Sequence, residues 1–243
     1  MNIASTPAGE MILGLRDVSK RYANGTLAND RVSLAVARGE IHAIVGENGA
    51  GKSTVMKMLY GLEQPSSGEI VLEGSPVAFR HPRDAIAAGI GLVPQHIELV
   101  PSFTVADNVV LGCEPHRGPW LDRPRAADEV RATAERFGLA VDPRAPVGEL
   151  SIGEQQRVGI LKALHRGARI LLLDEPSAVL PPQQVQALFD ALRQMAAAGL
   201  TVVLITHKLV EVREVSDRFT VRPAAARPVF KLAMSEATRS CPV

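Results

Sequence analysis

Alternation of apolar and polar residues near the start of the chain predicts a layer of half-exposed strands. Residues 12–18 and 32–36 alternate with the period of a strand that has one face on a core. Wholly apolar runs occupy residues 41–45 and 170–173. Continuous runs of this length are typical of parallel strands that are buried on both faces. The chain is therefore expected to contain an antiparallel β layer and a buried parallel sheet.

Helical periodicity fills much of the remaining chain. The clearest stripe has the spacing i, i+3, i+4, i+7 and comprises Val185, Leu188, Phe189, Leu192 and Met195. The expected helices cover residues 55–59, 83–88, 104–111, 124–137, 151–164 and 182–198, and further strands cover residues 69–72, 76–79, 91–95 and 201–205. Residues 115–124, rich in Pro, Gly and Arg, are expected to form a loop. The pattern predicts an α/β protein with a small helical subdomain inserted at about residues 96–165.

A glycine-rich loop lies between the strand at residues 41–45 and the helix that follows. Its residues are Gly46, Glu47, Asn48, Gly49, Ala50, Gly51, Lys52, Ser53 and Thr54, and their spacing fits the phosphate loop of nucleoside triphosphatases. The glycines let backbone N–H groups turn toward a polyphosphate, and the helix N-terminus adds its unpaired amides. Lys52 would lie across the β and γ phosphates, and the Ser53 hydroxyl would ligate Mg²⁺. The loop predicts binding of ATP or GTP.

Two acids end the apolar run at residues 170–173. Asp174 and Glu175 are thereby placed at the C-terminal edge of the parallel sheet, where α/β proteins bind ligands. Asp174 is expected to hold Mg²⁺ through water, and Glu175 to polarise an attacking water. The strand at residues 201–205 brings His207 to the same edge. A single histidine at a strand end is more often a hydrogen-bonding residue than a catalytic one, but its neighbours here favour a catalytic role.

A second helix N-terminus carries an unusual glycine. Ser151 followed by Glu154 forms a capping box, so a helix is expected to begin there. Gly153 in the first turn lowers helix stability, which indicates that something approaches the backbone closely. An anion at this helix N-terminus would explain the glycine.

Composition and charge narrow the class of protein. Lys and Arg total 27 against 26 Asp and Glu, so no basic field favours nucleic acid as a partner. The longest apolar runs have the length of strands, well short of a transmembrane helix. The N-terminus lacks the pattern of a secretory signal, so a cytoplasmic location is expected.

Together these motifs resemble the nucleotide-binding domain of ATP-binding cassette (ABC) transporters. Residues 150–156 resemble the signature segment that separates this family from other phosphate-loop proteins, and the resemblance extends over about residues 12–221. It implies an ABC-type phosphate-loop fold over residues 1–221 that binds ATP and Mg²⁺. Gln95 would touch the metal and couple to the membrane subunit, His207 would contact the γ-phosphate, and Tyr22 would stack on adenine.

The same resemblance implies a mechanism that needs two cassettes. Two domains close head to tail, with ATP between residues 46–54 of one and Ser151, Gly153 and Gln155 of the other. The second cassette would be another copy or another chain. Closure would drive an attached membrane permease, supplied by a solute-binding protein, with the cassette peripheral on the inner face of the membrane.

Several segments resemble the importers of simple sugars and nucleosides, in which two cassettes are usually fused. These segments are residues 46–51, 58–61, 177–180 and 206–209. The expected function is therefore an ATP-hydrolysing subunit that powers sugar or nucleoside import. One alternative is a truncated cassette that binds ATP but is inactive without a second one. The other is a non-transport ABC ATPase of translation or DNA repair, although residues 95–150 are too short for the coiled coil of the repair proteins.

The end of the chain departs from the family pattern. Residues 222–228 place three alanines between prolines, which neither continues a strand nor makes a good hairpin turn. We expect a disordered tail over residues 222–243, because the reading frame is lost near Arg222 or because the chain is truncated, with the second cassette absent.

Overall fold

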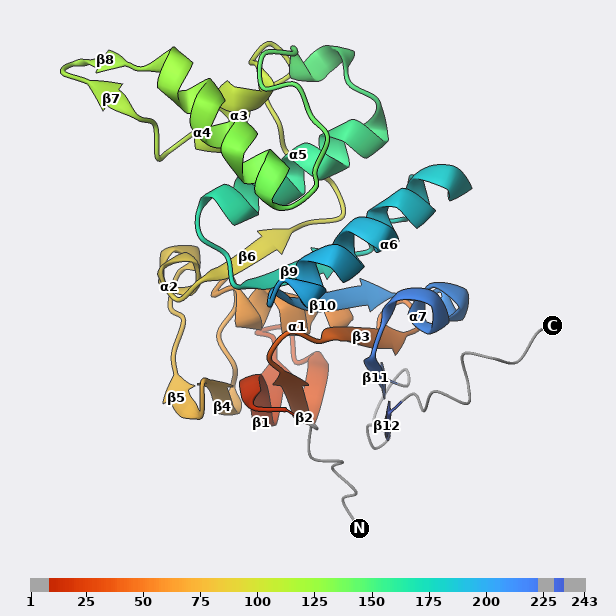
Figure 1. Cartoon of the computed structure of the whole chain (residues 1–243). Helices are drawn as coiled ribbons and strands as arrows, with labels where there is room; N and C mark the ends of the chain where they lie inside the picture. Colours follow the sequence, from red (N-terminus) through yellow and green to blue (C-terminus); the bar gives the residue numbers. More distant parts are fainter. Residues whose placement is uncertain (1–8, 223–229, 234–243) are drawn as a thin grey trace.

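A six-stranded sheet forms the centre of the molecule in the computed structural model, which describes residues 9–222 and 230–233 (Figure 1). Its strands lie in the order β12 (Phe230–Ala233), β11 (Arg218–Arg222), β3 (Ile41–Gly46), β10 (Thr201–Thr206), β9 (Ile170–Asp174) and β6 (Ile90–Val93). All neighbouring pairs are parallel except β11 and β12. The parallel strands share one C-terminal edge, where ligands of such sheets bind.

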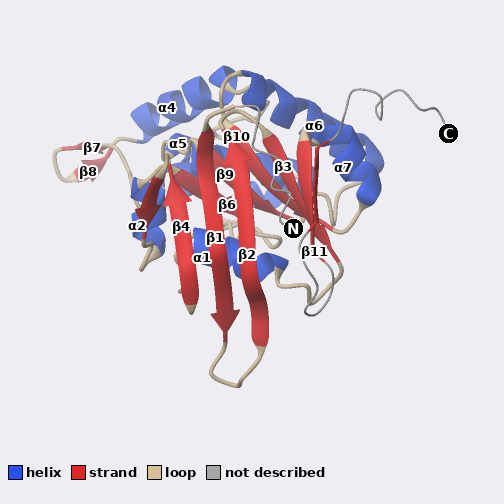
Figure 2. Cartoon of the chain, turned by 90° about the horizontal axis from the view of Figure 1, so that it is seen from below, coloured by secondary structure: helices blue, strands red, loops and turns tan. Residues whose placement is uncertain are grey.

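A second, antiparallel sheet lies beneath the first, as expected from the alternating pattern (Figure 2). Its order is β2 (Leu27–Ala37), β1 (Met11–Arg21), β4 (Ser67–Leu72) and β5 (Ser75–Val77). β1 is paired on both sides, with β2 and with β4. The sheet therefore combines the two strands before the phosphate loop with the hairpin that follows the first helix.

Side chains of the central strands alternate between two cores. Leu171 and Leu173 pack into a core with helix α6 (Pro182–Ala197), and the alternate residue Leu172 packs into the other core with helix α1 (Lys52–Leu59) and the antiparallel sheet. Each fully buried leucine contributes about 1.5–3 kcal/mol. Because both faces of the parallel sheet are covered, its strands are continuous apolar runs, and their ends are fixed in space.

Three helices form the upper part of the molecule. They are α3 (Val105–Val110), α4 (Arg123–Arg136) and α5 (Ile152–His165), with a 3₁₀ turn η1 (Val147–Glu149) before α5. Thr104 and Asp107 form a capping box on α3. The buried amide of Asn108 holds the preceding loop by accepting from Val100 N and donating to the oxygens of Val100 and Thr104.

Some elements were not expected from the sequence. The segment expected to be a loop contains a small hairpin of β7 (His116–Arg117) and β8 (Trp120–Leu121), which projects from the helical part (Figure 1). Trp120 is 77% exposed at this hairpin. Helix α7 (Leu209–Val215) was also not expected, whereas α2 (Pro82–Ala87) and the other helices differ from the expected bounds by only a few residues.

Five residues of the expected disordered tail lie in strands: Arg222 ends β11, and the other four form β12. β12 (Phe230–Ala233) pairs antiparallel with β11 and extends the central sheet by one strand. An unpaired sheet edge offers N–H and C=O groups to any nearby segment. The pairing of β12 therefore depends on the free edge of β11 rather than on local sequence. Residues 223–229 and 234–243 of the expected tail lie outside the described residues.

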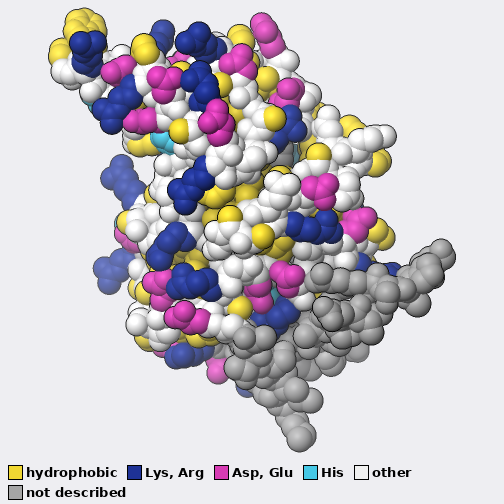
Figure 3. All heavy atoms as spheres, viewed as in Figure 1, with side chains coloured by type: hydrophobic (Ala, Val, Ile, Leu, Met, Phe, Trp, Pro, Cys, Tyr) yellow, Lys and Arg dark blue, Asp and Glu magenta, His cyan; other side chains and the backbone are white. Residues whose placement is uncertain are grey.

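Two surface features bear on partners. On the face shown in Figure 3, positive and negative side chains intermingle rather than forming a field of one sign. Across the described ranges, no helix has both the length and the hydropathy to cross a bilayer.

Candidate nucleotide site

The glycine-rich loop connects β3 with α1, which begins at Lys52. Lys52 is buried, and its Nζ donates hydrogen bonds to the carbonyl oxygens of Gly46 and Glu47 at 2.7 and 2.9 Å. The ammonium group thus closes the loop on itself. The Gly51 carbonyl accepts from Val55 N at 3.1 Å and from Asn29 Nδ2 at 3.2 Å. The loop is therefore fixed by its own lysine and by β2.

Gly51 is required by the space around it. Its φ is +75°, and a Cβ there would lie 2.2 Å from the carbonyl oxygen of Ala28. Gly49 also has a positive φ, +83°, but a Cβ there would meet nothing within 4 Å.

We expect Gly51→Ala to destabilise the protein more than Gly49→Ala. Both variants incur the left-handed penalty of about 1–2 kcal/mol, and only the first adds a clash with backbone, of about 1–3 kcal/mol. Urea unfolding measures the difference. The affinity of Gly51→Ala for Mg-ATP should also fall, because the clash displaces the loop. Equal unfolding midpoints for the two variants would contradict this account.

Tyr22 lies beside the loop, at the end of β1. Its hydroxyl is 3.4 Å from Thr54 Oγ1 in the first turn of α1, and the ammonium of Lys20 lies 5.2 Å from its ring centroid. The cation occupies one side of the ring. Stacking of adenine on the Tyr22 ring remains a prediction.

Ser53 and Asp174 meet between the loop and the end of β9. Ser53 lies close enough to the Asp174 carboxylate to lower its pKa by hydrogen bonding. Burial raises the pKa of Asp174, the Ser53 hydrogen bond opposes this, and the nearby charge of Glu175 raises the pKa further. A hydroxyl and a carboxylate are hard oxygen donors that suit Mg²⁺, and a cation there would favour the charged form.

This donor set is small. No group of three or more His, Cys, Asp or Glu suited to a metal occurs in the described part of the chain. Mg²⁺ in nucleotide sites typically takes one or two carboxylates and completes its shell with phosphate oxygens, water and other oxygen donors. Ser53, Asp174 and the amide oxygen of Gln95 therefore fit Mg²⁺ that arrives with a nucleotide.

Glu175 contacts two other predicted site residues, the catalytic candidate His207 and the metal-ligand candidate Gln95. Its Oε1 lies 3.1 Å from His207 Nδ1, and its Oε2 lies 3.5 Å from Gln95 Nε2. Its φ of +46° is uncommon for a residue with a side chain, and its N–H donates to Ile205 O at 3.0 Å. Three segments far apart in sequence thus converge on one carboxylate. The roles of Glu175, Gln95 and His207 stay predictions.

A buried acid behind this edge was not singled out from the sequence. Glu211 of α7 accepts hydrogen bonds from the hydroxyls of Ser177 and Thr206, at 2.6 and 3.0 Å. The signal for α7 was present in the spacing of Leu209, Val212 and Val215, but Glu211 itself carries no motif.

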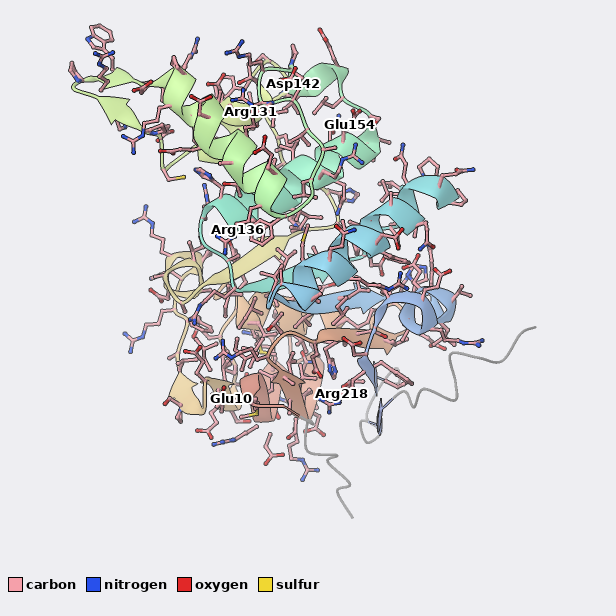
Figure 4. All side chains as sticks on the ribbon, viewed as in Figure 1. Glu10, Arg131, Arg136, Asp142, Glu154 and Arg218 are labelled. Carbon is pink, nitrogen blue, oxygen red and sulfur yellow. The ribbon has the colours of Figure 1, made fainter. Side chains whose placement is uncertain are left out.

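The signature segment lies elsewhere. Ser151 and Glu154 form the expected capping box on α5, and Gln155 Nε2 donates to Leu150 O at 3.0 Å. Figure 4 places Glu154 in the upper, helical part, whereas the phosphate loop and α1 belong to the lower part. The close approach expected at Gly153 is made by Gln184 of α6, whose Oε1 would lie 2.2 Å from a Cβ there.

The strand, glycine loop and helix, with acids at the adjoining strand end, define a phosphate-loop nucleotide-binding domain. The family model described as "ABC transporter" matches residues 29–178. The chain belongs to this family.

Two relatives show which members of the family the chain resembles. The chain is 46% identical over 214 residues to the nucleoside import ATP-binding protein NupA of Lactococcus lactis subsp. cremoris (strain MG1363), covering 88% of the chain and 42% of the relative. It is 42% identical over 227 residues to the ribose import ATP-binding protein RbsA 3 of Rubrobacter xylanophilus (strain DSM 9941 / JCM 11954 / NBRC 16129 / PRD-1), covering 92% and 46%. The chain therefore resembles sugar and nucleoside import ATP-binding proteins, and spans less than half the length of these two.

Solved structures agree on the fold. A nucleotide-free ATP-binding cassette from an ABC transporter superposes with a TM-score of 0.78 at 25% identity, covering 88% of both chains. This similarity confirms the ABC-type α/β fold with its antiparallel layer.

Proposed function

We propose that this chain is an ATP-hydrolysing cassette that binds Mg-ATP, closes on a second cassette and powers import of a sugar or nucleoside through a membrane permease. The observation that carries the proposal is the convergence of Gln95 and His207 on Glu175 at the edge that also holds Ser53 and Asp174. Phosphoryl transfer requires positioning and charge stabilisation, and these groups supply both. The import ATP-binding relatives support the direction of transport and the solute class.

The mechanism follows from what each side chain can do. Lys52 would exchange the two loop carbonyls for phosphate oxygens. Mg²⁺, held by Ser53, Asp174 and Gln95, would neutralise phosphate charge. Glu175 would orient water and accept its proton, and the His207 ring would keep the carboxylate oriented through their 3.1 Å contact.

Exposed apolar side chains support closure on a second cassette. Ile152 at the N-terminus of α5, Val179 after β9, and Leu209 and Val210 at the N-terminus of α7 are all more than half exposed. Val179 and Leu209 follow the two strands that form the catalytic edge. Burying such residues against another chain is favourable, at about 25 cal/mol per Å². The second cassette would bring its own Ser151, Gly153 and Gln155 to the nucleotide.

The permease contact is proposed at a largely apolar pocket of about 280 Å³, whose lining includes Pro94, the chain neighbour of Gln95. Its walls come from β6, α2 and α5, so an occupant would touch both the central sheet and the helical part. Residues 93–94 and 97–99 supply part of the lining, and Gln95, which reaches Glu175, lies between them in the sequence. A permease segment seated here would therefore be coupled to the catalytic carboxylate.

A second candidate function is nucleotide binding without turnover. It is favoured by the separation of the signature segment from the phosphate loop within the chain. In that case hydrolysis would require the second cassette of another chain.

One experiment separates the two candidates. Phosphate release and sedimentation are measured on the purified chain with and without Mg-ATP. Under the main proposal, Mg-ATP produces a dimer and turnover, and Ser151→Arg abolishes both while binding of a fluorescent ATP analogue remains. The reason is that a long cationic side chain would fill the space of the partner's nucleotide.

Thr104→Arg is the matched control. Thr104 has the same role on α3 that Ser151 has on α5, because each caps its helix through a capping box. Both substitutions lose a cap of about 0.5–2 kcal/mol, but only Ser151 belongs to the proposed interface. ATP binding by a monomer that neither pairs nor releases phosphate would establish the second candidate.

A further inference from the structure

The carboxylate of Glu211 is the centre of a buried network. Glu211 is 6% exposed, and its two oxygens accept from different hydroxyls: Oε1 from Ser177 Oγ at 2.6 Å and Oε2 from Thr206 Oγ1 at 3.0 Å. Both hydroxyl residues are 2% exposed. Burying a carboxylate costs much free energy unless the group is hydrogen-bonded and paired. The two hydroxyl hydrogen bonds offset part of that cost.

Lys208 supplies the compensating charge. The side-chain Nζ of Lys208 lies 3.0 Å from Glu211 Oε1 and 3.4 Å from the Ser177 carbonyl oxygen. The backbone N–H of Lys208 donates to Thr206 Oγ1 at 3.1 Å. An ionised carboxylate can accept from both hydroxyls and from the ammonium at once, whereas an amide has one acceptor oxygen only. A glutamate can therefore accept from all three donors, whereas a glutamine could not.

The two hydroxyls flank the catalytic edge. Ser177 comes two residues after Glu175, and Thr206 comes one residue before His207. Backbone hydrogen bonding between the ends of β9 and β10 reaches Glu175 N and Ile205 O. Glu211 adds a connection beyond the end of that ladder. It joins the loop that carries Glu175 to the strand end that carries His207.

Glu175 needs such support because its backbone is strained. A φ of +46° in a residue with a side chain persists only where the surroundings fix it, and costs about 1–3 kcal/mol. Core packing already anchors α7 through Val212 and Val215, and the β9–β10 register is fixed by backbone pairing. The fold at this edge therefore has other supports, and the polar network adds orientation.

We propose that Glu211 is a positioning residue that sets Glu175 and His207 relative to each other, by joining Ser177 to Thr206. This inference rests on the proposed function for its catalytic consequence. Loss of the carboxylate would free both loops and separate the 3.1 Å pair, while the phosphate loop would be unchanged.

The test compares Glu211→Ala and Glu211→Gln with the wild-type chain. We expect the alanine variant to lose at least tenfold in kcat with ATP affinity within threefold, and the glutamine variant to recover part of the loss. Asn108→Ala is the matched control, since Asn108 is a fully buried polar residue that also holds a loop through three hydrogen bonds. It lies on α3 and should lower the melting temperature without lowering kcat.

A second measurement needs no hydrolysis. Amide hydrogen exchange is followed on peptides covering residues 174–180 and 206–211 in the nucleotide-free protein, and we expect at least tenfold faster exchange in Glu211→Ala but not in Asn108→Ala. If the wild-type chain shows no turnover but Glu211→Ala gives this exchange pattern, hydrolysis by the single chain is refuted and the positioning role is retained. Unchanged exchange, or equal losses of kcat in both alanine variants, would overturn the inference. Should Glu211→Ala fail to fold, Glu211→Gln carries the same comparison with a smaller expected loss.

Discussion

Glu175→Gln is expected to lower ATP turnover by about 10²–10⁴-fold, the range for removal of a general base. The amide keeps the size of the carboxylate and can still accept a hydrogen bond from His207, but it cannot take a proton from water. Steady-state phosphate release measures the loss. The variant should still bind Mg-ATP, because Lys52, Ser53 and Asp174 are unchanged.

The same substitution should strengthen the closed state. The charge of Glu175 acts on Asp174 and raises its pKa, so it lies close enough to oppose a polyphosphate as well. Removing that charge favours retention of ATP, and sedimentation should show a stable dimer in Mg-ATP. Asp190→Asn is the control, because this α6 acid pairs at the surface with Arg193 at 3.1 Å. Turnover within threefold of wild type in Glu175→Gln would contradict its role.

Local sequence was sufficient for those parts of the site that are local in structure. The phosphate loop from Gly46 to Thr54 and the capping box of Ser151 each depend on residues a few positions apart, and both lie where the pattern predicts. The acids at the end of β9 were also predictable, because a buried apolar strand leaves its polar residues at the edge.

Contacts between distant segments could not be predicted in this way. Glu211 meets Ser177 across 34 positions, and His42 meets Thr220 across 178 positions. β12 pairs with the edge of β11, and it follows residues 222–228, whose three alanines between prolines predict no strand. Such features follow from tertiary packing, which no short pattern records.

A buried ionic cluster joins β11 to the strand before the phosphate loop. Glu40 is 8% exposed, and its Oε1 lies 3.0 Å from His42 Nδ1. Arg218 Nη1 lies 3.2 and 3.3 Å from the two carboxylate oxygens of Glu40. His42 Nε2 is 2.9 Å from Thr220 Oγ1. Figure 4 shows Arg218, the first residue of β11, beside the two sheets. The cluster therefore ties β11 to β3, which leads into the loop.

The pKa of Glu40 gives the pH dependence. Burial alone would raise it, but hydrogen bonds from His42 and from the backbone of Ala37, with the charge of Arg218, outweigh burial and hold the pKa below its ordinary value. A lowered folded-state pKa means that the stabilisation is complete above the unfolded value of about 4.3 and is lost as pH falls through the folded value. The advantage of wild type over Glu40→Gln should therefore be constant near neutral pH and shrink in acid.

Glu40→Ala is expected to lower the free energy of unfolding by about 3–5 kcal/mol, because it removes the buried carboxylate that pairs with the partly buried Arg218 guanidinium. Urea unfolding at pH 7 measures the loss. Glu73→Ala is the matched control, since the Glu73 carboxylate also contacts two arginines, Arg38 at 3.0 Å and Arg169 at 2.9 Å, but does so at the surface. Water replaces those exposed contacts, so its loss should be much smaller. Equal losses in the two variants would mean that burial of the Glu40 cluster is not what makes it stabilising, and that β11 is held to β3 mainly by the backbone ladder from Arg218 to Arg222.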